Sequence, residues 1–131
     1  MPEVREILQK ALKFYDDHDW IQGQSFSRVY RGPYEGEIIT GGCLEGSCMA
    51  ATGNTVIYSN MVIYSWTYDA FRALAEAAYE LFPERFPFAL PGAVHKFNDH
   101  ELTTREDALL VLKHAIRKAE DGHHDRAEPA G

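Results

Sequence analysis

The chain has 131 residues and a formal net charge of −7 at pH 7, with 45% hydrophobic and 25% charged residues. This length and balance are typical of one globular domain that buries its own core, and no apolar run reaches the roughly 18 residues of a membrane-spanning helix. The acidic charge disfavours a nucleic-acid partner, whose phosphates bind clustered Lys and Arg, and two cysteines are too few for a disulfide scaffold.

The N-terminal part of the chain begins with a helical pattern. Apolar residues recur at intervals of three and four between positions 2 and 17, which predicts an amphipathic first helix. Trp20 and Gly23 follow it, and we expect a turn that folds the indole ring back onto this helix. Residues 24–40 hold Gly and Pro between short apolar runs, which indicates a loose loop or a hairpin.

The middle of the chain contains two contrasting segments. Residues 43–51 are mostly small and predict a short, buried, Cys/Gly/Ala-rich helix around which the other helices pack. Residues 55–66 contain the tetrapeptide Val-Ile-Tyr-Ser twice, which is typical of strands. We therefore expect a small β-hairpin or irregular arm near 55–66, and an exposed apolar arm of this kind would favour self-association.

Two longer helices are predicted in the second half. The first covers residues 67–82 and is ended by Pro83, after which a proline-rich connector packs down as a lid. The second begins at Thr103 or the threonine after it, where the spacing fits a capping box, and ends near residue 120. Residues 121–131 are polar and predict a flexible tail.

The predicted fold is therefore mainly α, with α+β as the alternative. We expect about four helices in a single domain over residues 1–120. The N-terminal residues alternate charged and apolar types instead of forming a secretory signal, so we expect a cytoplasmic protein.

A sparse framework of single residues runs through these elements: Trp20 with Gly23, Cys43-x-x-Gly46, Asn98-Asp99, and Thr103 before the last helix. This framework resembles an uncharacterised family of small proteins from actinobacteria and their bacteriophages, over most of residues 4–119. The resemblance implies a mostly helical domain of phage or actinobacterial origin, and it implies no reaction.

One candidate chemistry is that of a thiol. Cys43 near a helix start, with His95 as base and Asn98 or Asp99 as the third residue, has the order of roles of a thiol-dependent hydrolase or transferase. We favour a buried cysteine packed in a helix, because six histidines and two cysteines generate many such triples by chance. Zinc binding by Cys43, Cys48, His95 and His100 has the right ligand types but the wrong cysteine spacing, so no metal or cofactor is predicted.

Two polar segments have structural and functional interpretations. Asn98 and Asp99 are typical of turns, and we expect them to brace the entry to the last helix. Thr40-Gly41-Gly42 precedes a predicted helix start and could cradle an anion, which leaves a small-ligand binder at the Gly41-Gly42 loop as a further alternative.

The function that we predict is a non-catalytic interaction or regulatory protein that binds a host or phage protein. The expected contact surface consists of exposed aromatic residues, because such side chains dominate interface energetics. They are Tyr58, Tyr64, Trp66, Phe86 and Phe88. A homo-oligomer through residues 55–66 is a second expectation, and neither a membrane nor a nucleic acid is expected as a partner.

Overall fold

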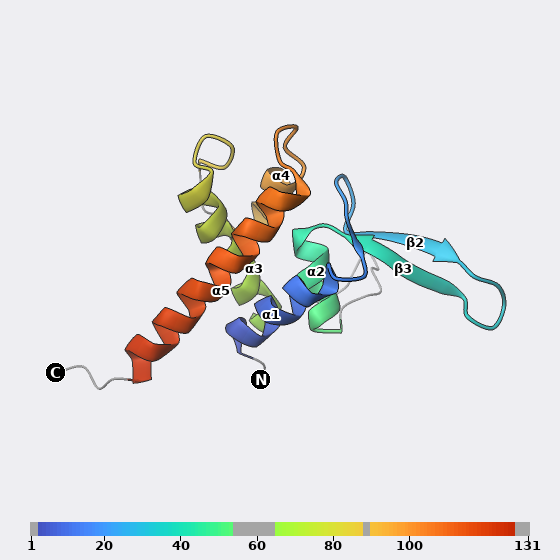
Figure 1. Ribbon diagram of the computed structural model, residues 1–131, viewed down its shortest axis with the longest axis horizontal. Helices are drawn as coiled ribbons and strands as arrows, with labels where there is room; N and C mark the ends of the chain where they lie inside the picture. Colours follow the sequence, from blue (N-terminus) through green and yellow to red (C-terminus); the bar gives the residue numbers. More distant parts are fainter. Residues whose placement is uncertain (1–2, 54–64, 88–89, 128–131) are drawn as a thin grey trace.

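The computed structural model describes residues 3–53, 65–87 and 90–127, with side chains up to residue 121 (Figure 1). Within these residues the chain forms five α-helices, one short 3₁₀ helix and a three-stranded sheet. In chain order the elements are α1 (Val4–Phe14), β1 (Asp19–Trp20), β2 (Phe26–Tyr30), β3 (Glu37–Gly42), α2 (Leu44–Ala51), α3 (Ser65–Leu81), the 3₁₀ helix η1 (Pro91–Ala93), α4 (Val94–Asn98) and α5 (Arg105–Ala127). The fold is thus α+β with mainly helical content.

The core lies between the helices. α1 contacts α2, α3 and α5, while α3 also packs along α5, the long helix that crosses the molecule in Figure 1. The periodic face predicted for the first helix is buried at Ile7, Leu8 and Ala11, because these side chains recur on one side of the helix. The largest fully buried apolar side chains are Phe71, Phe97, Ile7, Leu8, Leu44, Leu74 and Leu112.

The small sheet has the strand order β1-β3-β2. β1 pairs with β3 in parallel, and β2 pairs with β3 antiparallel from Phe26 opposite Gly42 to Tyr30 opposite Glu37. The register shifts between Ser27 and Arg28. We call residues 26–42 the β arm, because β2, β3 and their connection extend away from the helices in Figure 1.

The β arm settles one of the two sequence predictions of a hairpin, and the other falls mostly outside the described residues. Residues 24–40 were open between a loop and a hairpin, and the hairpin is correct. The arm expected near 55–66 lies mostly outside the described residues, and its last two residues begin α3 instead.

The start of α5 agrees with the second of the two predicted threonines, whereas its end differs from the prediction. Thr104 is the capping residue: its Oγ1 accepts from Asp107 N at 3.2 Å, and its N donates to Asp107 Oδ2 at 3.2 Å. Thr103 is buried beside it and is not the cap. The helix continues to Ala127, beyond the expected end near residue 120.

The root of the β arm is held against the helices. Cys43 N donates to Ser25 O at 3.1 Å, and the Tyr15 hydroxyl donates to Gly42 O at 2.9 Å. Gly46 lies so close to Ser25 that a Cβ atom on this glycine would overlap the Ser25 carbonyl oxygen. The packing of α2 on the arm therefore requires the absence of a side chain at this position.

This close approach generates a prediction for Gly46→Ala. The overlap is with backbone, which cannot rotate away, so we expect a loss of about 2 kcal/mol or more in unfolding free energy. For a chain of this size the melting temperature, followed by circular dichroism, should fall by roughly 5 °C or more. Gly92→Ala is the matched control, because its nearest neighbour is the Tyr68 hydroxyl, the end of a movable side chain. Equal melting temperatures for the two variants would contradict the packing argument.

Candidate functional site

The side chain of Asn98, at the end of α4, is fully buried and makes four hydrogen bonds. Its Oδ1 accepts from Trp20 Nε1 at 2.7 Å and from Leu44 N at 3.0 Å. Its Nδ2 donates to Ile21 O at 2.9 Å and to Asp99 Oδ1 at 3.0 Å. Both donor hydrogens and both acceptor positions of the amide are therefore used inside the protein.

The turn after Trp20 is hydrogen-bonded to the same end of α4. Gly23, whose φ of 84° suits glycine, donates its N–H to Asp99 Oδ1 at 2.9 Å. Gln22 Nε2 donates to Asn98 O at 2.9 Å and to His100 O at 3.0 Å. The turn is thus bound through side chains and backbone to the connection between α4 and α5.

The N-terminus of α2 is the third part of this arrangement. Cys43 is its N-cap residue, and the Sγ atom accepts from Gly46 N at 3.3 Å. Leu44 N is satisfied by Asn98 Oδ1. Because these N–H groups already have partners within the chain, the helix N-terminus does not present them to an anion.

Six of the seven framework residues therefore lie together in what we call the Asn98 network. Hydrogen bonds join Trp20, Gly23, Asn98 and Asp99. Cys43 and Gly46 bond each other and adjoin this group through Leu44, whose N–H donates to Asn98. Sequence reasoning identified these residues but did not predict the contacts between them, which join positions up to 78 residues apart. It overlooked Gln22 and the backbone of Ile21, since nothing in a single sequence distinguishes them.

The environment of Cys43 opposes the thiolate. The side chain is buried, and burial is the main reason why the pKa of the thiol is raised to about 11. The hydrogen bond from Gly46 lowers this pKa, whereas the negative charges of Glu45 and Asp99 raise it. Cys48 is completely buried and its pKa is raised further, again chiefly by burial.

His95 is paired with Glu45. Glu45 Oε1 accepts from His95 N at 2.9 Å and lies 3.2 Å from His95 Nδ1. Burial raises the pKa of Glu45, and the hydrogen bonds from His95 lower it in part. The thiol hypothesis needed the imidazole to act on Cys43, but the structure assigns the imidazole to a carboxylate on α2 instead.

Gly41 and Gly42 are part of β3 and not of a loop. A Cβ on Gly41 would lie 2.7 Å from Asp19 O, and one on Gly42 would lie 3.2 Å from both the Phe14 ring and Ser25 O. The glycines therefore permit close packing of strands on α1. The interpretation of Gly41-Gly42 as a loop is wrong, because these residues are buried in a strand.

The expected aromatic contact surface is only partly described. Tyr58, Tyr64 and Phe88 lie outside the described residues. Phe86 is only 4% exposed and belongs to the core, which corrects its assignment to an exposed surface. Trp66 is partly buried and packs against the core.

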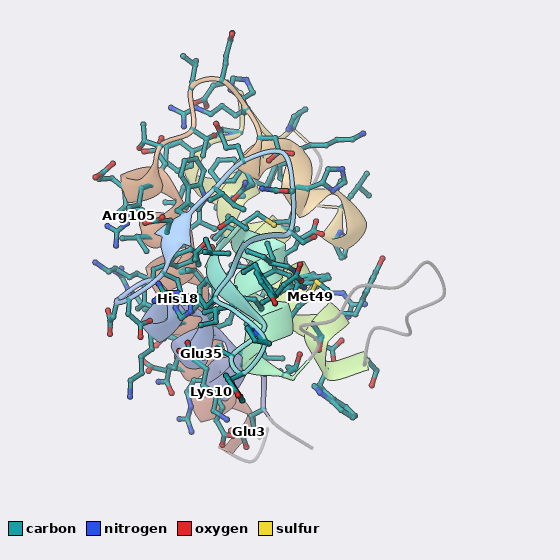
Figure 2. All side chains as sticks on the ribbon, turned by 90° about the vertical axis from the view of Figure 1, so that its right-hand side faces the viewer. Glu3, Lys10, His18, Glu35, Met49 and Arg105 are labelled. Atoms are coloured by element: carbon teal, nitrogen blue, oxygen red, sulfur yellow. The ribbon has the colours of Figure 1, made fainter. Side chains whose placement is uncertain are left out.

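A different set of exposed residues occurs on the β arm. Val29 is 45% exposed, Tyr30 67% and Tyr34 100%. Figure 2 views the molecule from the side to which the arm extends, and its labelled Glu35, between β2 and β3, lies in front of the helices. Sequence reasoning missed this surface; the two tyrosines that flank Gly32-Pro33 were the available signal.

An open pocket of about 400 Å³ lies between α1 and α2, away from the Asn98 network. It is lined by Lys10, Lys13, Phe14, Asp16, Asp17, Ala50 and Ala51. The two lysines and two aspartates offset each other in charge, so the lining favours neither an anion nor a cation.

Two further features were sought in the described part of the chain. There, no group of three or more His, Cys, Asp and Glu side chains is arranged to hold a metal ion. None of the helices described combines the length and apolar character needed to cross a membrane.

Comparison with known proteins gives one match. The model described as "Family of unknown function (DUF6197)" matches residues 1–118. No curated protein and no solved structure matches the chain.

The first prediction from this site concerns Asn98→Leu. Leucine has a similar size but leaves Trp20 Nε1, Leu44 N and Ile21 O without their partner, and each buried unpaired group costs about 1–3 kcal/mol. We expect the unfolding free energy, measured by urea denaturation, to fall by about 3 kcal/mol. Asp99→Asn, which keeps a carbonyl oxygen for Gly23 N, is the control and should cost less than about 1 kcal/mol. If Asn98→Leu lowered the unfolding free energy no more than Asp99→Asn, the network would not determine the stability of the protein.

The second prediction concerns alkylation of Cys43 by iodoacetamide, located by peptide mass spectrometry. With a pKa of about 11, the reaction should still accelerate between pH 9 and pH 10, whereas an ordinary cysteine with a pKa of about 8.5 approaches its plateau there. At pH 8 the smaller thiolate fraction makes Cys43 roughly two hundred-fold slower than free cysteine. His95→Ala should not change the rate. A reaction that is complete near pH 7 and depends on His95 would restore the thiol hypothesis.

Proposed function

The chain belongs to this family of unknown function, and we propose that it is a non-catalytic interaction protein that binds another protein through the β arm. The observation that carries the proposal is the exposure of Val29, Tyr30 and Tyr34 on an element that extends away from the helical core (Figure 1). Exposed aromatic side chains are the usual anchors of protein interfaces. Among the described residues, none of these three side chains belongs to the core or packs against it.

The architecture of the arm supports a binding role. β1 pairs with β3 at Gly41 and Gly42, so within the described residues the ribbon beyond Ser27 consists of β2 and β3 alone. A two-stranded ribbon is marginally stable in water and gains stability when another chain covers it. Ile38, which lies opposite Val29 in the ribbon, is only half-buried and adds to the apolar area that a partner would cover.

The chemistry of Cys43 supports the non-catalytic part of the proposal. Its sulfur accepts the hydrogen bond of a helix cap, and its pKa is about 11. Catalytic thiols have lowered pKa values and accessible sulfur atoms. The thiol-dependent hydrolase or transferase using Cys43 and His95 is therefore the less favoured function.

The partner and its setting follow from charge and from the framework residues. The chain carries −7 overall, which favours a protein over a nucleic acid. The resemblance of the framework to actinobacterial and phage proteins extends the proposal to a phage- or actinobacteria-encoded regulator whose partner is a host or phage protein. We propose the cytoplasm as its location, because both cysteines are free thiols and a reducing compartment keeps them so.

The test is photo-crosslinking from the arm. A photoreactive phenylalanine analogue replaces Tyr34 in the full chain, and the protein is irradiated in an extract of the cells that encode it. We expect a discrete adduct with a protein, at least about five-fold stronger than from the same analogue at Tyr79, a matched exposed tyrosine on α3. Excess wild-type chain should compete for the adduct, and excess Val29→Ser/Tyr30→Ser chain should not. Equal labelling from Tyr34 and Tyr79 would refute the proposed role of the arm.

A further inference from the structure

We propose that the open pocket between α1 and α2 binds a short free peptide in its zwitterionic form. The peptide carboxylate lies at the two lysines of the pocket, and the ammonium group lies at the two aspartates. This inference goes beyond the proposed function, because it concerns a different surface and does not depend on the β arm. The lining of the pocket, the order of its charges and its dimensions carry it.

The least exposed part of the lining is apolar. Phe14 and the last two residues of α2, Ala50 and Ala51, are partly buried and pack against the core. The charged residues of the lining are exposed. α1 and α2 lie side by side (Figure 1), and the small alanine side chains leave the space that the pocket occupies. A ligand in this space covers apolar surface with its middle part and meets charged side chains at its ends.

The Phe14 ring is held in place by its neighbours. It is stacked on the His18 ring, with the two centroids 4.1 Å apart. His18 Nδ1 lies 2.9 Å from Phe14 O and 2.7 Å from Asp17 Oδ1. Both oxygens are acceptors, so Nδ1 is the atom that carries the hydrogen. The α1 side of the pocket is therefore preformed, and binding does not have to order this ring.

The charges of the lining follow a simple order along the chain. Lys10 and Lys13 lie on the same face of α1 as Phe14, because they precede it by four residues and by one, with three between them. Asp16 and Asp17 follow the end of the helix, where the backbone also carries partial negative charge. The pocket therefore has a positive end and a negative end. This arrangement is complementary to a zwitterion and not to a simple anion or cation.

Three of these four charged side chains are available to a ligand. In the part of the chain that the structure describes, Lys10, Lys13 and Asp16 have no ion-pair partner. Asp17 is paired with His18, but a carboxylate accepts several hydrogen bonds and so can also accept from an ammonium group. Unpaired charges of opposite sign at the two ends of one pocket favour a ligand that satisfies both.

The dimensions of the pocket fit two or three residues of peptide. Its outermost charged residues, Lys10 and Asp17, are separated by about 10 Å if each position of α1 and the following turn advances about 1.5 Å. An extended peptide advances about 3.3–3.6 Å per residue, so a tripeptide spans this distance and a single amino acid does not. The pocket volume of about 400 Å³ lies within the range of about 300–1,000 Å³ found for small-molecule sites.

The first test is an NMR titration of the ¹⁵N-labelled full chain with the tripeptide Ala-Leu-Ala at pH 7, where both peptide termini are charged. We expect saturable shifts of the Ala50 and Ala51 amide signals. Acetylating the peptide N-terminus removes the ammonium charge, and amidating the C-terminus removes the carboxylate charge. Each change should raise the dissociation constant about three-fold, and both together about ten-fold, as expected for exposed ion pairs.

Three results of this titration would overturn the inference. The first is the absence of saturable shifts up to about 10 mM peptide, which excludes even a weak complex. The second is an equal dissociation constant for the free and the doubly blocked peptide, which would indicate an apolar groove for a segment of a larger protein. The third is a set of shifts confined to residues 26–42, which would place the peptide on the β arm.

The second test assigns each charge to its end of the pocket. Lys13→Gln should weaken binding of the free peptide about three-fold and leave the C-amidated peptide unaffected, because that peptide has already lost its carboxylate. Asp16→Asn should likewise weaken the free peptide and spare the N-acetylated one. Asp16 is chosen because Asp17 also holds His18. The matched control is Lys113→Gln, at an exposed lysine of α5, which should bind like the wild type. An equal loss for the free and the C-amidated peptide on Lys13→Gln would overturn the proposed orientation.

Discussion

The buried amide of Asn98 is the contact on which the rest of the structure depends. This one side chain forms hydrogen bonds with the Trp20 indole, with the first N–H of α2 and with Ile21 O. It is not exposed to water. Only an amide offers two donors and two acceptor positions in one planar group. A completely satisfied buried network of this kind fixes the relative positions of its members, since any displacement leaves a polar group unpaired. It thereby positions α2, and through α2 the root of the β arm.

The same network explains why a sequence pattern that suggests catalysis describes architecture here. A cysteine at a helix N-terminus with histidine and aspartate further along the chain has the composition of a thiol site. In the structure Cys43 is buried and accepts from Gly46, His95 bonds Glu45, and Asp99 accepts from Gly23. Each of these groups is already engaged, and the nearby carboxylates raise the pKa of the thiol. Residue types and their order define a possible site, but burial and partners decide the chemistry.

The sequence predicted the elements whose signal is local and missed those that depend on distant partners. The three- and four-residue spacing of α1 and the proline after α3 were sufficient, because helix faces and helix ends are encoded within a few residues. The β arm was left open between loop and hairpin, since its strands carry no stronger pattern than residues 55–66. Gly41 and Gly42 suggested a loop, whereas close contact with Asp19 O and the Phe14 ring requires them in a strand. The contacts of Asn98 span 54 and 78 residues, a distance over which one sequence has no periodicity to detect.

The register shift between Ser27 and Arg28 separates the root of the arm from its exposed end. On the body side, Gly42 O accepts from the Tyr15 hydroxyl and Ser25 O accepts from Cys43 N, so the root is fastened to α1 and α2. Beyond the shift Ile39 still packs against the core, while the side chains of Val29 and Tyr30 are exposed. An irregular residue in a ladder bends a strand locally. The shift therefore bends the arm at Ser27 and Arg28, and the direction of this bend sets where the exposed Val29 and Tyr30 side chains face.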